Sequence, residues 1–229
     1  PFPVMLNRET ADRLIAWVQR GGTLISEGCP GYWGDRGHVG PTQPNLGLDE
    51  LFGVRESYVE FTPDILGDLQ LTVGRSRVRG GLYLQAYEPT TGIPVGWYDD
   101  GRVAAVDNTF GQGRTRLIGT MAGYGYATHE GDRSPAFFAD ALRFTGAQQH
   151  VWASEPRVSA RLHDGPGGTY LWVANPKRLP LPVHLRLGER WRGLVPARSL
   201  WGAEAATSGG YITLTVGARD VAVIALTRP

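Results

Sequence analysis

Cys29 is the only cysteine of the chain, and it lies where a reactive side chain can be displayed. It follows a short apolar stretch, residues 23–26, that we predict to be a strand, and ligands of open α/β sheets bind at the carboxyl ends of strands. A thiol at such a turn becomes a nucleophile when a histidine and a carboxylate activate it. His129 and Glu130 follow a later predicted strand, residues 114–119, so Cys29, His129 and Glu130 are the catalytic candidates.

The residues around Cys29 argue against catalysis. A nucleophile on a strained strand-to-helix turn needs small residues two positions before and after it, and Glu27 occupies the first of these positions. Pro30 follows Cys29 directly and has no N–H group for an oxyanion hole. The sequence therefore favours Cys29 as a small, semi-buried residue at a strand end, with catalysis as the alternative.

The loop over residues 30–46 combines aromatic rings with amide, carboxylate and basic groups. Sugar recognition uses this combination, because rings stack on the sugar and polar groups bond its hydroxyls. The same composition suits a subunit interface. We expect an interface or a substrate rim, with self-packing and direct sugar binding as alternatives. The residues concerned are Tyr32, Trp33, Asp35, Arg36, His38, Gln43 and Asn45.

The sequence gives little indication of a metal site or of a phosphate-binding loop. The five histidines show no ligand spacing, so we expect no metal site and no cofactor. Gly111 and Gly113 precede a predicted strand, whereas a dinucleotide loop follows a strand and opens a helix. The glycines therefore predict a β-turn.

Two helices are expected to support the strand that leads to Cys29. The first begins at the cap residue Asn7 and ends at Gly21. Its apolar face recurs at helical spacing and consists of Ala11, Leu14, Ile15 and Val18. The second, residues 134–146, begins at Ser134-Pro135. We predict its buried residues to be Phe137, Phe138, Ala141 and Leu142.

Strand patterns fill the rest of the chain. Short strands over 57–61, 69–73, 82–87 and 103–106 predict a β-rich insertion, at about residues 53–110, in an α/β domain of residues 1–147. Residues 148–229 show turn clusters at roughly ten-residue intervals, which is typical of a small antiparallel β-sandwich. We expect Trp172 in the core of that sandwich; an exposed row of tryptophans would instead indicate a carbohydrate platform.

Composition sets broad limits. The chain has 229 residues and a net charge of +1, so no basic field indicates nucleic acid or an anionic membrane. No apolar run approaches the roughly 18 residues needed to span a bilayer. Localisation is left open, with the cytoplasm favoured. The chain starts at Pro1, and only one helix precedes the strand over 23–26, so we expect a truncated α/β sheet that is completed by oligomerisation or is unusually small.

Residues 6–53, with the run LISEGCPGYWGDRGHVGPTQPNLGLDELFG, resemble the trimerisation domain of family 42 glycoside hydrolases, the β-galactosidases of that family. Supporting similarities lie in GQGRTRLIGT (111–120), in residues 134–146 and in RDVAVIAL (219–226). The resemblance implies a (β/α)8 barrel that carries catalysis, an α/β domain related to class I glutamine amidotransferases and to flavodoxin-like folds that builds a trimer, and a small C-terminal β domain. This chain would correspond to the latter part of the second domain and the third.

The resemblance therefore implies a non-catalytic C-terminal fragment whose partners are further copies of itself, a trimer by resemblance, and a barrel absent from this chain. Retaining glycosidases need two carboxyl groups about 5 Å apart, and barrel enzymes hold such residues at the ends of barrel strands. The related amidotransferases place one residue between their histidine and glutamate, whereas His129 and Glu130 are adjacent. An amidotransferase-like enzyme using Cys29 and a carbohydrate-binding module remain the alternatives.

Overall fold

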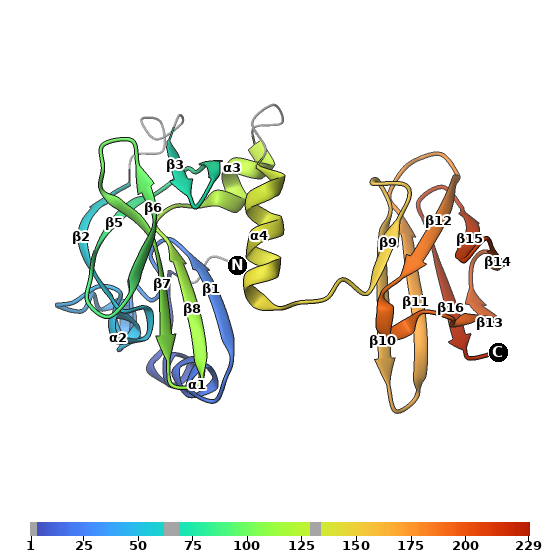
Figure 1. Cartoon of the computed structure of the whole chain (residues 1–229), viewed down its shortest axis with the longest axis horizontal. Coiled ribbons are helices and arrows are strands. Elements are labelled where there is room, and N and C mark those ends of the chain that lie inside the picture. Colours follow the sequence, from blue (N-terminus) through green and yellow to red (C-terminus); the bar gives the residue numbers. More distant parts are fainter. Residues whose placement is uncertain (1–3, 62–68, 129–133) are drawn as a thin grey trace. The chain divides into compact units, whose positions relative to one another are not determined.

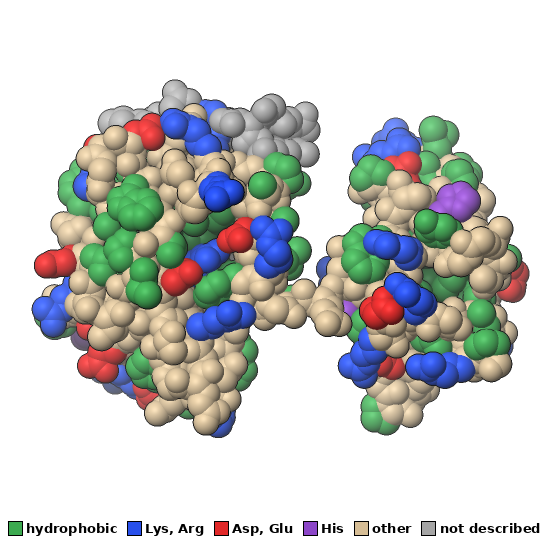
Figure 2. Space-filling model, in the orientation of Figure 1, with side chains coloured by type: hydrophobic (Ala, Val, Ile, Leu, Met, Phe, Trp, Pro, Cys, Tyr) green, Lys and Arg blue, Asp and Glu red, His purple; other side chains and the backbone are tan. Residues whose placement is uncertain are grey.

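The computed structural model describes residues 4–61, 69–128 and 134–229. The chain divides into two compact units, Pro1–Gly146 and Ala147–Pro229, and each has its own core. None of the helices in the described residues is long and apolar enough to cross a bilayer. Figure 2 shows positive and negative side chains interspersed on the visible face of each unit, in keeping with the net charge of +1.

One eight-stranded sheet forms the framework of the first unit (Figure 1). Its main path runs β1-β8-β7-β6-β3-β4, and β5 joins β2 to β7. Among the described strands only β1 and β8 pair in parallel. The strands are β1 Thr23–Glu27, β2 Val54–Glu60, β3 Gln70–Val73, β4 Ser76–Arg79, β5 Leu84–Pro89, β6 Ile93–Tyr98, β7 Val103–Phe110 and β8 Gly113–Ile118.

This sheet corrects the α/β fold predicted for residues 1–147. The strands of the expected insertion pair directly into the sheet that contains β1 and β8, so the unit is mostly β. The cause lies in the connections: β7 and β8 form a hairpin in which Phe110 pairs with Gly113, and tight hairpins join antiparallel neighbours. Parallel pairing needs a longer crossover, and among the named strands of the described residues only β1 and β8 pair in this way.

The described residues of the first unit form four α-helices and the short 3-10 helix η1 Asp35–Gly37; the α-helices are α1 Arg8–Gln19, α2 Leu48–Phe52, α3 Ala122–Thr128 and α4 Pro135–Thr145. Asn7 caps α1 by accepting a 2.8 Å hydrogen bond from the backbone N–H of Thr10. Gly146 ends α4 with a φ of 68°. Leu142, predicted to be buried, is 56% exposed because it lies on the outer side of α4. The five-residue α2 and seven-residue α3 are too short to show a helical period in the sequence.

Both faces of β1 and β8 are covered. Leu24 packs with the core that includes α1 and α2, and Ile25 packs with the core that includes Phe137 of α4. Arg116 of β8 joins this second layer to the sheet, because its guanidinium pairs with Asp107 at 2.7 Å and with Asp140 of α4 at 2.8 Å.

The second unit contains two four-stranded antiparallel sheets, ordered β10-β11-β16-β13 and β14-β15-β12-β9. Both contribute to one core, in which Leu171 and Ile224 of the first sheet meet Leu185 and Ile212 of the second. The elements are β9 Val151–Ala153, β10 Ser159–Gly165, β11 Gly168–Asn175, β12 Leu181–Leu187, η4 Glu189–Trp191, β13 Val195–Trp201, β14 Ala206–Ser208, β15 Tyr211–Val216 and β16 Asp220–Thr227.

The expectation that Trp172 lies in this core is wrong. Trp172 is 44% exposed because its neighbours in sequence, Leu171 and Val173, occupy the inward positions of β11. The buried tryptophan is Trp191, on the short 3-10 helix η4.

Candidate functional site at the end of strand β1

Cys29 occupies a strained turn two residues after β1. Its φ is 58°, a left-handed conformation that residues other than glycine rarely adopt. Such strain is characteristic of turns that display a nucleophile. The side chain is nevertheless buried, in a small cluster with Val4, Tyr83 and Met121.

Gln85 of β5 holds the backbone of this turn. Its side-chain oxygen accepts hydrogen bonds from the N–H of Cys29 at 2.8 Å and from the hydroxyl of Tyr87 at 2.7 Å. Its amide nitrogen donates to a carboxylate oxygen of Glu56 at 2.6 Å. The backbone carbonyl of Gln85 also accepts a 3.1 Å hydrogen bond from the hydroxyl of Tyr98. Both polar atoms of the buried Gln85 side chain thereby have hydrogen-bond partners.

The strand pairing of β2 and β5 brings this network together. Glu56 pairs with Tyr87, and Val59 pairs with Gln85, with a register shift between Glu56 and Tyr58. A bulge of this kind re-aims the side chains beside it. No local signal in the sequence predicted the network, since Gln85 and Cys29 are 56 residues apart.

The electrostatic surroundings suppress thiol chemistry. Burial, with a further contribution from the Glu56 carboxylate, raises the pKa of Cys29 to about 12. At neutral pH the reactive thiolate is then on the order of one part in 10⁵. The N–H of Cys29 is bonded to Gln85, and Pro30 has no N–H, so neither amide is free to stabilise an oxyanion. His129 and Glu130, the other two candidates, lie outside the described residues.

Glu27 has a structural partner. One of its carboxylate oxygens accepts a 2.7 Å hydrogen bond from the N–H of Gly123, in the first turn of α3. Burial raises the pKa of Glu27, and this hydrogen bond opposes the rise. The acidic residue that disfavours a nucleophile turn therefore fastens α3 to the end of β1.

The aromatic residues of the loop over residues 30–46 lie on the inner side of that loop. Tyr32 and Trp33 are half-buried and meet edge to face, with ring centroids 5.3 Å apart. Gln43 is buried, and its side-chain nitrogen donates to the carbonyl of Tyr32 at 3.1 Å. Its side-chain oxygen has no hydrogen-bond partner among the described residues.

The polar residues of the loop mostly bind the loop itself or α1. The Asp35 carboxylate accepts a 3.1 Å hydrogen bond from the N–H of Arg8, at the start of α1. Asn45 accepts a hydrogen bond from the N–H of Leu46 at 2.7 Å, and its nitrogen lies 3.4 Å from the carbonyl of His38. Arg36 and His38 present exposed side chains. Tyr32, by contrast, adjoins the turn at Cys29, because its N–H donates a 3.3 Å hydrogen bond to the Cys29 carbonyl and its side chain packs against the cluster that contains Cys29.

An apolar groove adjoins β1. It has a volume of about 190 Å³ and is lined by side chains that include Leu6, Leu14, Leu24, Pro30, Leu48 and Phe52. Within the described residues β1 pairs with β8 on one edge only, so its other edge presents unpaired backbone groups. The described residues hold no cluster of three or more histidine, cysteine, aspartate or glutamate side chains arranged for a metal ion.

Comparisons with solved structures place this fold among β-galactosidases. The β-galactosidase of Bacillus circulans sp. alkalophilus is 17% identical, with a TM-score of 0.75 over 99% of this chain. Gan42B, a family 42 β-galactosidase of G. stearothermophilus, is 16% identical with a TM-score of 0.70 over the whole chain. The enzyme of Halorubrum lacusprofundi is 22% identical with a TM-score of 0.65. No protein-family model and no curated protein matches the sequence.

The match covers only part of each enzyme. The chain spans 32% of the Bacillus circulans protein, 31% of Gan42B and 30% of the haloarchaeal protein. The predicted resemblance to family 42 β-galactosidases is thus confirmed as a likeness of fold over nearly the whole of this chain and about a third of theirs.

Proposed function

We propose that this chain is the non-catalytic C-terminal part of a β-galactosidase-like glycoside hydrolase, and that it assembles and supports a catalytic (β/α)8 barrel absent from the chain. The observation that carries this proposal is the fold match, which includes 99% of this chain and 32% of the Bacillus circulans enzyme. Because a barrel of this kind needs about 250 residues, it belongs to the part of such a polypeptide that the match leaves out.

The open edge of β1 supports an assembly role. A strand that is paired on one edge only, beside an apolar groove, can accept a further strand, whose side chains fill the groove while its backbone pairs with β1. We propose that the remainder of the polypeptide supplies this strand, and that the completed first unit carries the contacts of a trimer. The loop over residues 30–46 then lies at a subunit interface or at the rim of the substrate site.

We further propose that the turn at Cys29 descends from an amidotransferase-like nucleophile turn. The positive φ of Cys29 after a parallel strand supports this ancestry. The raised pKa of its thiol and the bonded N–H support a structural role in the present protein. Resistance of Cys29 to alkylation at neutral pH, together with no glutaminase activity, is the expected result.

Activity measurements test the main proposal. The complete polypeptide of the reading frame that encodes this chain is expected to hydrolyse a nitrophenyl β-galactoside and to have the solution mass of a trimer. The 229-residue chain alone is expected to show no hydrolysis. Hydrolysis by this chain alone, or a reading frame without a barrel sequence, would refute the proposal.

A further inference from the structure

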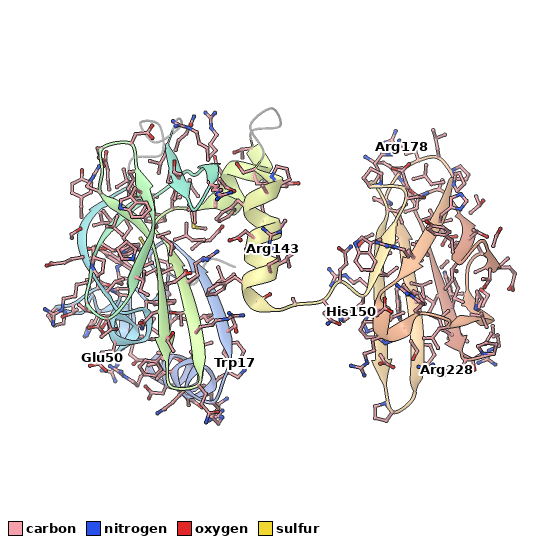
Figure 3. All side chains as sticks on the ribbon, in the orientation of Figure 1. Trp17, Glu50, Arg143, His150, Arg178 and Arg228 are labelled. Carbon is pink, nitrogen blue, oxygen red and sulfur yellow. The ribbon has the colours of Figure 1, made fainter. Side chains whose placement is uncertain are left out.

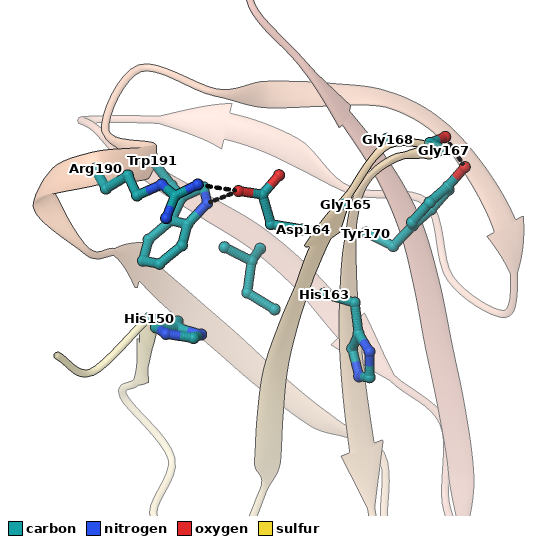
Figure 4. Close-up of a pocket in the computed structure, with 10 residues that line it drawn as sticks. His150, His163, Asp164, Gly165, Gly167, Gly168, Tyr170, Arg190 and Trp191 are labelled. Carbon is teal, nitrogen blue, oxygen red and sulfur yellow. Dashed lines mark hydrogen bonds and ion pairs between the residues drawn. The ribbon is translucent and has the colours of Figure 1, made fainter. Parts of the chain in front are cut away.

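A cleft in the second unit has the chemistry of a binding site. It lies at the free edge of β10, has a volume of about 530 Å³, and falls in the range of small-molecule sites (Figure 4). His150, Asp164, Arg190 and Trp191 lie on one side of the edge strand, and His163 and Tyr170 lie on the other.

Asp164 is held at the centre of the cleft. Its carboxylate accepts hydrogen bonds from the Trp191 indole N–H at 2.9 Å, from the Thr169 hydroxyl at 2.8 Å and from Arg190 at 3.2 Å. The indole and hydroxyl bonds are the main causes that lower the pKa of Asp164, so the group is ionised at neutral pH. A carboxylate offers about four acceptor positions, which leaves one for a ligand hydroxyl.

Arg190 supplies donors beside this acceptor. Its side chain is 71% exposed, and its guanidinium lies 5.2 Å from the centroid of the Trp191 ring. A guanidinium has five N–H groups in a fixed fork, and the described residues take one of them, through Asp164. A fixed acceptor and a fork of donors therefore stand side by side.

Aromatic rings lie beside Asp164 and Arg190. His150 packs against Trp191 with ring centroids 4.4 Å apart, and Figure 3 labels it just before β9. On the other side of the edge strand, the ring centroids of His163 and the exposed Trp172 are 5.7 Å apart. Val223 pairs with Trp172 on one side and with Trp201 on the other, so two exposed tryptophans project from one sheet face about 10 Å apart.

We infer that this cleft binds a neutral saccharide, with Asp164 accepting from one sugar hydroxyl, Arg190 donating to its neighbour, and ring faces stacking on the sugar. The ionised carboxylate disfavours an anionic ligand, and the guanidinium disfavours a cationic one. A vicinal diol satisfies both groups, because each hydroxyl donates and accepts. Trp172 and Trp201 extend the site for a longer saccharide. This inference is independent of the proposed assembly role.

Titration of the complete 229-residue chain tests the inference. The probes are methyl β-galactoside, lactose and methyl β-glucoside, with inorganic phosphate as the anionic comparison. The readout is the NMR signal of the Trp191 indole N–H, assigned with Trp191→Phe. We expect at least one saccharide to shift this signal saturably and phosphate to leave it unchanged. Arg190→Gln and Asp164→Asn are each expected to weaken saccharide binding about tenfold or more, the usual cost of a lost charge-assisted hydrogen bond.

Arg192→Gln is the matched control. Arg192 is an exposed arginine that follows η4, pairs with Glu189 and lies outside the lining of the cleft, so its loss should change affinity less than twofold, about the effect of an exposed ion pair. Asp164→Asn can disturb the fold, because Asp164 accepts a hydrogen bond from Trp191, whereas the Arg190 side chain is mostly exposed. If Asp164→Asn unfolds the protein, the affinity of Arg190→Gln decides the test. Failure of all three saccharides to bind, binding of phosphate instead, or equal affinity in wild type and Arg190→Gln would overturn the inference.

Discussion

The backbone of Cys29 adopts the turn of a displayed nucleophile, whereas the groups around it suppress the chemistry of its thiol. Gln85 takes the N–H of Cys29, and burial beside Glu56 holds the thiol in its neutral form. Glu27 and Pro30, which flank Cys29, are the reason the sequence favours a structural role for it, and that role stays a prediction. Gln85 and Glu56 could not be predicted, because only the pairing of β2 with β5 brings them to the turn.

The pKa of Glu56 makes stability depend on pH. Burial raises this pKa above its ordinary value of 4.5, and the hydrogen bond from Gln85 only partly opposes the rise. The unfolded chain therefore releases the proton at lower pH than the folded chain, and stability falls as pH rises through the folded pKa. Glu56→Gln keeps an acceptor for Gln85 and removes the ionisation, so its stability relative to wild type should increase with pH.

Urea unfolding at several pH values from about 4 to about 8 measures this difference. Glu88→Gln, an exposed change on the neighbouring strand β5, serves as the control and should follow the wild-type pH profile. Glu27 shares the direction of the pKa shift, so some pH dependence should remain in Glu56→Gln. Parallel profiles for Glu56→Gln and wild type would show that Glu56 is not the source.

At the scale of elements, the hairpin of β7 and β8 decides how the first unit is built. Alternating apolar residues and turn glycines predicted most strands of the first unit, and capping residues predicted both ends of α1 and the end of α4. The sequence could not show that the expected insertion pairs into the same sheet, because pairing depends on contacts between distant segments. The short helices α2 and α3 left no period to detect.

Arg116 tests how α4 is fixed to this hairpin. Its side chain is 8% exposed, pairs with Asp107 and Asp140, and lies 4.3 Å from the centroid of the Phe144 ring. Arg116→Met leaves Asp107 without its partner and Asp140 with Arg143 alone, and should lower the free energy of unfolding by about 3 kcal/mol. Arg143→Met removes an exposed arginine on α4 (Figure 3) that also pairs with Asp140, and should cost less than about 1 kcal/mol. Equal losses in denaturant unfolding would contradict this account.

At the scale of the whole molecule, the fold is that of about a third of a β-galactosidase, and within the described residues of its first unit one edge of β1 is unpaired. The sequence predicted a sheet with missing partners from the single helix before β1. It could not predict the groove beside that edge, which Leu6, Leu14 and Phe52 form from separate elements. The open edge and the groove together give the proposed assembly role a physical site.

The most direct test is β-galactoside hydrolysis by the upstream part of the complete polypeptide, produced separately and titrated with this chain. The account predicts that hydrolysis rises saturably as the chain is added, and that Leu14→Glu, which places a charge in the groove, abolishes the rise. Gln19→Glu, on the exposed side of α1, should act like wild type. Hydrolysis that does not respond to the chain, or that responds equally to Leu14→Glu, would contradict the account.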